Sequence, residues 1–560
     1  MELRRTLLIV AIAVVTYLLI LSWQKDYGPK PGSTSPDAVA ETQAAAEVPA
    51  SDTPSADVPD VPVIAAATTP TDAPSVTATP VAGVVRVKTD VLDLQINTRG
   101  GDIIRAALPE YTESIDSKNP FVLLNNTAAH QYVAQSGLIG PDGPDGKSAG
   151  RPLYQTTSES FKLVEGKDTL EVVLTLPAEN GVSISKIFEF TRGSYLIKTR
   201  YVINNASAAP WSGLLYAQLK RDNAKDPSAS NQGFGMMTFL GGAWWTAEKP
   251  YNKADFDEFS EKPLKQAATG GWAAILQHYF LSAWIAEPGT ANVYTTRRSG
   301  NDNIIGYTGP ITTVAPGTQQ TLSASLYVGP KIQKDLEAIS AGLELTVDYG
   351  WLWPVSQFLF WLLGLIHGWV NNWGWAIILL TVLVKAAFFQ LSAASYKSMA
   401  KMRQVMPEMT RIKEQFGGDR AKMSQAMMDL YKKEKINPLG GCLPILVQMP
   451  VFIALYYCLM ESVELRHAEW ALWINDLSVM DPYFVLPLIM GATMFIQQQL
   501  NPAPPDPMQA RVMKIMPIVF TFMFLWFPAG LVLYWVVNNT LSIIQQWVIT
   551  RNIENAAKKA

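Results

Sequence analysis

The sequence predicts a polytopic α-helical membrane protein with six transmembrane helices, a cytoplasmic helical hairpin, an interfacial helix and a large periplasmic β-sandwich domain. Three observations support this fold class. A short apolar run follows two arginines at the N-terminus, a long middle section alternates apolar and polar residues, and the second half holds several long apolar stretches. The 560 residues carry a formal net charge of −3, which is informative only through its uneven distribution.

Residues 1–24 are predicted to form an uncleaved signal-anchor transmembrane helix. Arg4 and Arg5 precede the apolar run 7–21, and no small-residue cleavage pattern follows it. The arginines favour a cytoplasmic N-terminus. A signal peptide that is removed is the alternative. Residues 25–83 are rich in Pro, Ala and Thr and cannot bury enough apolar surface to fold, so we expect a disordered tether.

Residues 84–335 have the pattern of β-structure. Leu92, Leu94 and Ile96 alternate with polar residues. A second group shares one parity that Lys186 interrupts: Val182, Ile184, Phe188 and Phe190. Period-two patterns bounded by Gly, Asn and Pro indicate strands with one buried face. The number of such strands predicts one large β-sandwich, outside the inner membrane because it follows an outward-running anchor.

The apolar stretches of the second half predict the membrane domain. They cover 351–370, 373–389, 443–460, 482–500, 512–526 and 530–550. The loop 391–440 holds ten Lys or Arg, whereas 462–481 holds one Arg and four acidic residues, so the first should be cytoplasmic and the second outside. Only one span then fits between the β-domain and the basic loop.

This topology assigns each remaining segment. Residues 336–371 become a linker and an interfacial amphipathic helix, with tryptophans at headgroup depth. Residues 372–550 form a five-span core that includes the cytoplasmic hairpin 391–440, and residues 551–560 are a short cytoplasmic tail. Both termini are expected in the cytoplasm.

Several classes of chemistry lack a motif in the sequence. Cys442 and Cys458 lie on one apolar helix about 24 Å apart and cannot bridge. The four histidines are isolated, and there is no phosphate-binding loop or nucleophile elbow. We therefore expect no catalytic residue, metal or cofactor, no DNA partner, and a protein that is not an enzyme.

Lys385 is the most informative polar residue of the predicted spans. No acidic residue lies in the five C-terminal spans, and a charge at mid-helix costs roughly 2.5–3.5 kcal/mol on insertion scales, so this side chain should face protein or water. Snorkelling to the cytoplasmic interface is the alternative. Thr381 lies one turn earlier on the same face. Further polar residues of the spans are Gln448, Asn538, Asn539, Gln545 and Gln546.

Two structural readings of these polar residues stay open. They could line a hydrated cavity open to the cytoplasm, or they could hold the bundle by hydrogen bonds between helices. The stretch 512–526 would make a helix of about 22 Å, shorter than the hydrocarbon core, and Pro517 and Pro528 oppose its extension. A short span of this kind should thin the bilayer beside it.

The basic loop should fold as a helical hairpin broken at Gly417-Gly418, with Asp419 as the cap of its second helix. Its methionines offer an adaptable apolar surface, and its basic residues suit anionic headgroups or ribosomal RNA. A self-packed, solvated hairpin is the alternative. The candidate contact residues are Lys401, Met402, Arg403, Met406, Met409, Met423 and Met427.

Three sequence motifs resemble the YidC/Oxa1/Alb3 family of membrane protein insertases. They are the segments 396–402 (YKSMAKM), 437–442 (NPLGGC) with 448–450 (QMP), and 526–534 (WFPAGLVLY). The match is dense from 348 to 551, and upstream it rests on the order of anchor, tether and β-domain.

The resemblance implies an insertase and foldase that needs no ATP and works alone or beside the Sec translocon and its accessory subunits. It also implies contacts with nascent membrane proteins, a ribosome at the hairpin, and membrane lipids. Lys385 would be the positive charge of a groove open to cytoplasm and lipid, with Thr381 beside it. The residues that would line the substrate path are Met449, Phe452, Met523, Trp526, Tyr534 and Trp535. At the position of Lys385 the family usually has arginine, and at the position of Trp535 it usually has tyrosine.

Two other functions fit parts of the pattern. A small-solute transporter or channel could also have proline-broken helices, but the spans show no internal repeat and no acid for ion coupling. A cell-envelope binding protein could use its β-domain and only anchor itself with its spans. Five spans with a methionine-rich hairpin exceed the needs of an anchor.

Overall fold

The computed structural model describes residues 58–59, 83–148, 150–229, 238–434, 443–501 and 507–559. These residues all belong to one compact unit. The predicted anchor 1–24 and nearly all of the predicted tether 25–83 lie outside the described residues, so both stay predictions.

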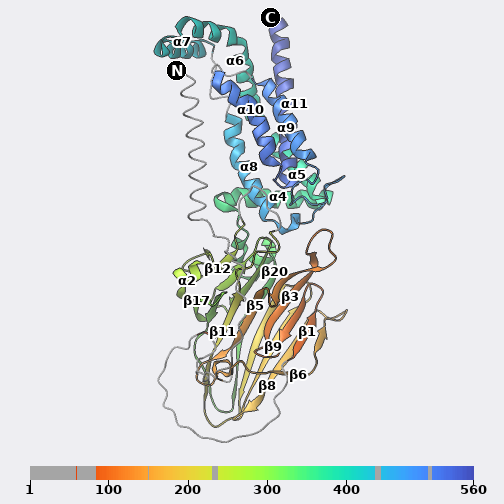
Figure 1. Cartoon of the computed structure of the whole chain (residues 1–560), viewed down its shortest axis with the longest axis vertical. Helices are drawn as coiled ribbons and strands as arrows, with labels where there is room; N and C mark the ends of the chain where they lie inside the picture. Colours follow the sequence, from red (N-terminus) through yellow and green to blue (C-terminus); the bar gives the residue numbers. More distant parts are fainter. Residues whose placement is uncertain are drawn as a thin grey trace, which may run out of the picture. The chain divides into compact units, whose positions relative to one another are not determined.

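Residues 84–330 contain a sandwich of two mainly antiparallel sheets (Figure 1). The larger sheet contains β1 (Val84–Lys88), β2 (Asp93–Asn97), β3 (Asp102–Thr112), β4 (Pro120–Asn126), β5 (Gln131–Ile139), β7 (Ser160–Lys162), β11 (Trp211–Arg221), β14 (Lys265–Thr269), β17 (Ala291–Ser299), β18 (Asp302–Thr308) and β19 (Thr312–Val314). The smaller sheet contains β6 (Gln155–Thr156), β8 (Thr169–Glu179), β9 (Val182–Thr191), β10 (Leu196–Asn205), β12 (Gly241–Trp245), β13 (Asn252–Ala254), β15 (Trp272–Leu276), β16 (Phe280–Ala286) and β20 (Thr318–Pro330). The predicted β-sandwich is confirmed.

Alternation along the strands places one side of each sheet in the core. Leu94 and Ile96 of β2 are fully buried, while their neighbours are half-buried. Burial of one face in this manner is what a period-two pattern indicates. In β9, Phe188 and Phe190 are buried, and Lys186 between the apolar positions is fully buried as well. Lys186 therefore continues the inward parity, and the interruption predicted from its charge is wrong.

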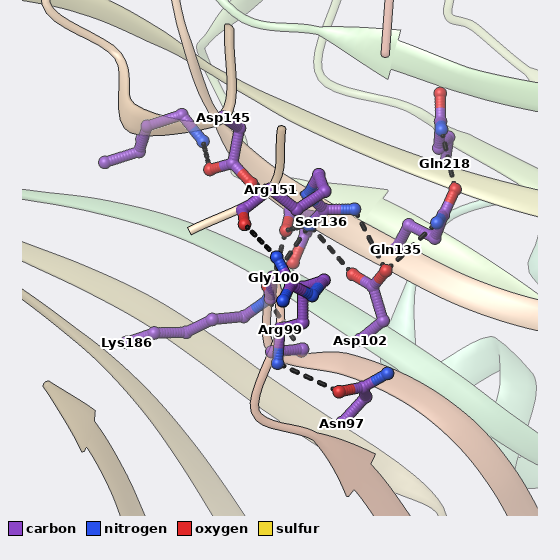
Figure 2. A network of polar contacts seen from close by, with 12 residues as sticks. Asn97, Arg99, Gly100, Asp102, Gln135, Ser136, Asp145, Arg151, Lys186 and Gln218 are labelled. Carbon is purple, nitrogen blue, oxygen red and sulfur yellow. Dashed lines mark hydrogen bonds and ion pairs between the residues drawn. The ribbon is translucent and has the colours of Figure 1, made fainter. Parts of the chain in front are cut away.

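A polar network inside the sandwich accommodates this lysine (Figure 2). The Lys186 ammonium donates hydrogen bonds to the backbone oxygens of Gly100 (3.1 Å), Gly101 (2.8 Å) and Ser136 (3.0 Å). Since Lys186 belongs to the smaller sheet and its acceptors to β5 and the turn before β3, the network joins the two sheets. Gly101 has a φ of 66°, and a Cβ there would lie 2.8 Å from the lysine Cδ, so the approach requires glycine.

Arg151 supplies the second cation of the network. Its guanidinium donates to both carboxylate oxygens of Asp102 at 2.9 Å and to Asp145 at 2.6 Å. Gln135 donates to Asp102 at 3.0 Å. Two cations thus balance two carboxylates in the interior, as buried charges require.

The remaining elements are helical. Short ones are α2 (Glu258–Glu261), α3 (Gln333–Ile339) and the 3₁₀ turns η1 (Pro144–Gly146), η2 (Leu343–Thr346), η3 (Gly350–Leu352) and η5 (Val463–Leu465). The longer helices are α4 (Trp353–Val370), α5 (Trp373–Ala387), α6 (Phe389–Phe416), α7 (Arg420–Lys433), α8 (Leu443–Glu461), α9 (Val485–Leu500), α10 (Pro507–Phe524) and α11 (Ala529–Lys559). Helices thus occupy each of the predicted spans of the core and the predicted interfacial segment.

The helical region packs around α11, which contacts α5, α6, α8 and α9 (Figure 1). Its core includes Leu363 of α4, Ile377 of α5, Met490 of α9 and Val532 of α11, all essentially buried. By length and apolar composition, no single described helix qualifies as a membrane span, whereas α5 and α6 qualify together across a 66° bend. The number of crossings stays a prediction.

Two predicted boundaries in this region change. α10 has 18 residues and runs from Pro507 to Phe524, so the predicted bounds 512–526 of a 15-residue helix are wrong. The helix is about 27 Å long at 1.5 Å per residue. α11 continues to Lys559, so most of the predicted tail 551–560 extends the last helix.

Candidate functional site

The candidate site centres on Lys385, in the last turn of α5. Asn372 caps the start of this helix, because its side-chain oxygen accepts a hydrogen bond from the backbone N–H of Trp375 at 3.0 Å. Lys385 is only 7% exposed. The predicted orientation toward protein rather than lipid therefore agrees with its burial.

The Lys385 ammonium joins three helices. It donates to the hydroxyl of Ser542 on α11 at 2.7 Å and lies 3.5 Å from the amide oxygen of Gln448 on α8. The Ser542 hydroxyl in turn donates to the backbone oxygen of Asn538 at 2.8 Å. Among the described residues no carboxylate pairs with Lys385, so its charge is solvated by neutral groups.

Ser542 was missed by the sequence reasoning. It lies four residues after Asn538, on the same face of α11, and this spacing could have identified it. Thr381 is buried on α5 as predicted, but its hydroxyl donates to the backbone oxygen of Ile377 at 2.7 Å, one turn earlier in the helix. Such back-bonding satisfies the hydroxyl within its own helix.

Other polar residues of α11 bond to neighbouring segments. Asn539 donates to Thr493 at 3.4 Å, Gln545 to the backbone oxygen of Phe389 at 3.1 Å, and Gln546 to the backbone oxygen of Leu500 at 3.1 Å. These contacts support the alternative in which the three residues hold the bundle together.

The predicted apolar path divides into an aromatic cluster and an exposed surface. In the cluster, the Phe452 ring of α8 lies 6.2 Å from the ring of Tyr534 and 5.0 Å from that of Trp535. Tyr534 is buried in the helical core. Trp535 and Met523 are half-buried and pack against the same core. The most exposed members are Met449 at 42% and Trp526 at 36%.

The helical hairpin has the predicted break and cap. α6 and α7 are separated at Gly417-Gly418, and the Asp419 carboxylate accepts from the backbone N–H groups of Ala421 (3.1 Å) and Lys422 (3.2 Å). Most candidate methionines face inward: Met409 is buried, and Met402, Met406 and Met427 pack around it.

The exposed surface of the hairpin differs from the predicted one. Met423 is half-buried, whereas Met428, which the sequence reasoning omitted, is 51% exposed. Lys401 is exposed, and Arg403 donates to the backbone oxygens of Leu500 (2.7 Å) and Gln499 (3.3 Å) at the end of α9. The methionine packing favours the self-packed alternative for the apolar face, and the basic residues remain outside it.

Polar contacts also join the β-sandwich to the segment that follows α8. Arg466 donates to the backbone oxygens of Thr112 (2.6 Å) and Glu113 (3.1 Å). Its guanidinium lies 5.5 Å from the Phe121 ring centroid and 5.6 Å from that of Phe280.

His278 makes a second contact of this kind. Its Nε2 lies 2.8 Å from the backbone oxygen of Met460 at the end of α8. Burial lowers the pKa of His278 to about 3, with a smaller contribution from the nearby Lys331. The neutral ring therefore acts as the donor in this contact.

Comparisons with known proteins place both the β-sandwich and the helical region in described families. Residues 84–362 match the family described as YidC periplasmic domain, and residues 365–557 match the family described as 60Kd inner membrane protein. The chain belongs to the YidC family of membrane protein insertases. Members of this family are bacterial inner-membrane proteins with a periplasmic domain, and it is not a family of enzymes.

Relatives at high identity cover the whole chain. A membrane protein insertase YidC from Stutzerimonas stutzeri is 56% identical, and one from Pseudomonas fluorescens (strain SBW25) is 55% identical. In both cases the match covers 100% of each chain. A crystal structure of an active YidC insertase matches 84% of this chain and 92% of its own at 18% identity, with a TM-score of 0.36, which is too low for a structural comparison.

Proposed function

We propose that the chain inserts hydrophobic segments of newly made proteins into the inner membrane from the cytoplasm, through a positively charged groove open to lipid. The observation that carries the proposal is Lys385, a buried cation whose contacts in the described residues are the neutral groups of Ser542 and Gln448. A charge held in a medium of low dielectric constant attracts an acidic or polar segment more strongly than a charge in water does.

The proposed mechanism needs no chemical step. An acidic or polar tail is drawn toward the ammonium of Lys385, and the apolar segment beside it moves along the exposed side chains of Met449 and Trp526 into lipid. Apolar burial provides the driving force, at about 25 cal/mol per Å². The mechanism therefore requires neither ATP hydrolysis nor a catalytic residue.

The topology and the partners belong to the same proposal. The basic surface of α6 and α7 is placed in the cytoplasm, with both termini, where it suits a ribosome or anionic headgroups. The β-sandwich is the surface for accessory subunits of the Sec translocon, with which the chain would cooperate for part of its substrates.

The experiment compares insertion of small membrane proteins with acidic or neutral tails in cells that depend on variants of this chain. Lys385→Ala should reduce insertion of the acidic-tailed substrates by roughly tenfold or more, because removal of a charge-assisted contact is worth about 1.5–3 kcal/mol. Lys385→Arg should retain insertion because it keeps the charge.

Two controls separate charge from packing. Lys385→Met keeps an unbranched side chain without the charge and should behave as Lys385→Ala does. Lys401→Ala removes an exposed lysine from the hairpin and should leave the two tail classes equally inserted. Equal activity of Lys385→Ala and Lys385→Arg would contradict the role of the charge, and normal insertion without the protein would contradict the function.

A further inference from the structure

The segment between α8 and α9, residues 462–484, has the opposite polarity to that of a loop in water. Its two aspartates face the protein, since Asp476 and Asp481 are both buried. The Asp481 carboxylate accepts a hydrogen bond from the indole N–H of Trp473 at 2.9 Å. The Asp476 carboxylate accepts from the backbone N–H of Ser478 at 2.8 Å and from its hydroxyl at 2.6 Å. The protein therefore satisfies carboxylates that a solvated loop would leave to water.

The apolar and aromatic side chains of the same segment face outward. The exposed fractions of Leu472, Tyr483, Val479 and Phe484 are 84%, 68%, 41% and 37%. In water, folding normally places such side chains inside and carboxylates outside. The exchange of the two kinds of side chain indicates that the surroundings of this segment are less polar than water.

The backbone holds Leu472 outward in an unfavourable conformation. Its φ is 58°, in the left-handed region that disfavours branched side chains. It lies at the tip of the turn 470–474, in which the Ile474 N–H donates to the Ala471 oxygen at 3.1 Å and the Trp470 N–H donates to the Ile474 oxygen at 3.0 Å. Glycine adopts this backbone conformation without strain. Strained residues of this kind cluster at functional sites, so the exposed leucine side chain itself requires an explanation.

The turn is attached to the start of α5, among tryptophans. Asn372, the cap of α5, donates to the backbone oxygens of Glu469 at 3.2 Å and Trp470 at 3.1 Å. The Trp470 ring lies 6.1 Å from the ring of Trp375, which is 50% exposed, and Trp369 near the end of α4 is 81% exposed. Tryptophans of membrane proteins gather at the depth of the lipid headgroups. The turn therefore lies where acyl chains are the nearest apolar partner.

We propose that this segment is seated in the bilayer leaflet at the start of α5, with Leu472, Tyr483 and Phe484 in contact with acyl chains just below the headgroups. Contact with lipid removes these side chains from water, which is favourable. Asp476 and Asp481 keep their hydrogen bonds to the protein, as groups at the edge of hydrocarbon require. The proposed topology makes this leaflet periplasmic. The inference rests on the membrane location of the family, and not on the insertion activity.

The test attaches the fluorophore bimane to single cysteines of the full-length protein, in which Cys442 and Cys458 are replaced by alanine. Each labelled protein is placed as one copy per nanodisc, in phospholipid that carries a doxyl quencher near the headgroup. Bimane at Leu472→Cys and at Tyr483→Cys should be quenched by the doxyl lipid. Iodide in the water should quench both less than an exposed control, by roughly tenfold, because transfer of an anion into apolar surroundings is costly.

The matched control is Asn475→Cys, because Asn475 belongs to the same segment and is exposed and polar. Its bimane should be quenched by iodide and only weakly by the doxyl lipid. Equal iodide quenching at Leu472→Cys and Asn475→Cys would refute the proposal, because the turn would then lie in water. Protection of Leu472→Cys from iodide without quenching by the doxyl lipid would also refute it, because protein would then cover the turn.

Two features of the design keep the result decisive. Tyr483→Cys answers the same question independently if Leu472→Cys does not fold. Fluorescence quenching reports contact with lipid whether or not the chain inserts substrates. Loss of insertion in a labelled variant therefore bears on the proposed function alone, and loss of quenching by lipid bears on the seating of this segment alone.

Discussion

Replacement of Lys186 by methionine should destabilise the β-sandwich, although no partner of this lysine is near it in sequence. The substitution keeps the length of the apolar stem and removes the ammonium. Two of the three acceptors, the backbone oxygens of Gly100 and Ser136, also accept from Arg151 at 3.1 and 3.0 Å. Only the oxygen of Gly101 loses its side-chain donor, at about 1–3 kcal/mol.

A second effect is electrostatic. Without Lys186, the single charge of Arg151 faces the two buried carboxylates of Asp102 and Asp145. Removal of the ammonium also removes its desolvation cost, which is large enough to lower the pKa of Lys186 and offsets this electrostatic loss. We therefore expect a total loss of about 1–3 kcal/mol in the local unfolding free energy, set by the oxygen of Gly101 that loses its donor.

The assay is hydrogen exchange on the full-length protein at pH 6, followed in peptides from β3, β5 and β9. Lys198→Met on β10 is the matched control, because that lysine is exposed and its ion pair with Glu189 should contribute at most about 1 kcal/mol. A second substitution, Asp145→Asn, should restore part of the stability lost in Lys186→Met because it restores charge balance. Equal protection in Lys186→Met and Lys198→Met would refute the reasoning, as would additive losses in the double variant.

Two further predictions concern pH and the contact between the regions. Burial lowers the pKa of Lys186 to about 7, so between pH 7 and the ordinary lysine value near 10.4 the unfolded chain binds more protons than the folded one. The stability of the β-sandwich should therefore rise as pH increases through this window, and the Lys186-dependent part of the rise should be absent in Lys186→Met; identical pH slopes in both proteins would contradict this. Arg466→Met should accelerate hydrogen exchange around residues 112–121 by roughly tenfold or more, because it removes charged hydrogen bonds worth about 1.5–3 kcal/mol. The control Arg298→Met on β17 should not accelerate it. Unchanged exchange in Arg466→Met would show that the contact with Thr112 is not stabilising.

The sequence was sufficient for features that depend on neighbouring residues. Alternation in β2 predicts its buried face, because burial on one side of a sheet imposes a period of two. The cap at Asp419 was predictable for the same reason, since a cap bonds to backbone groups two or three residues ahead. The buried Lys385 could be expected because a charge exposed to lipid is too costly.

Features that depend on distant segments were not predictable in this way. The acceptors of Lys186 come from segments 50 to 86 residues away in sequence, so its charge suggested an interruption although its parity already pointed inward. The partner of Lys385, Ser542, lies 157 residues away. The start of α10 differs from the predicted one because the helix begins in the polar residues before the apolar stretch, at Pro507, and proline is well tolerated in the first turn of a helix.

The contact between Arg403 and the end of α9 has a mechanical consequence. α6 has 28 residues, about 42 Å of helix, and Arg403 is close to its midpoint. The hydrogen bonds from Arg403 to Leu500 and Gln499 attach the middle of α6 to the end of α9. Pro407, one turn nearer the tip of the hairpin, has no backbone N–H to donate, which weakens the helix at that point. A force applied at the hairpin tip should therefore bend α6 near Pro407, and the part of it that reaches Arg403 is passed to the end of α9.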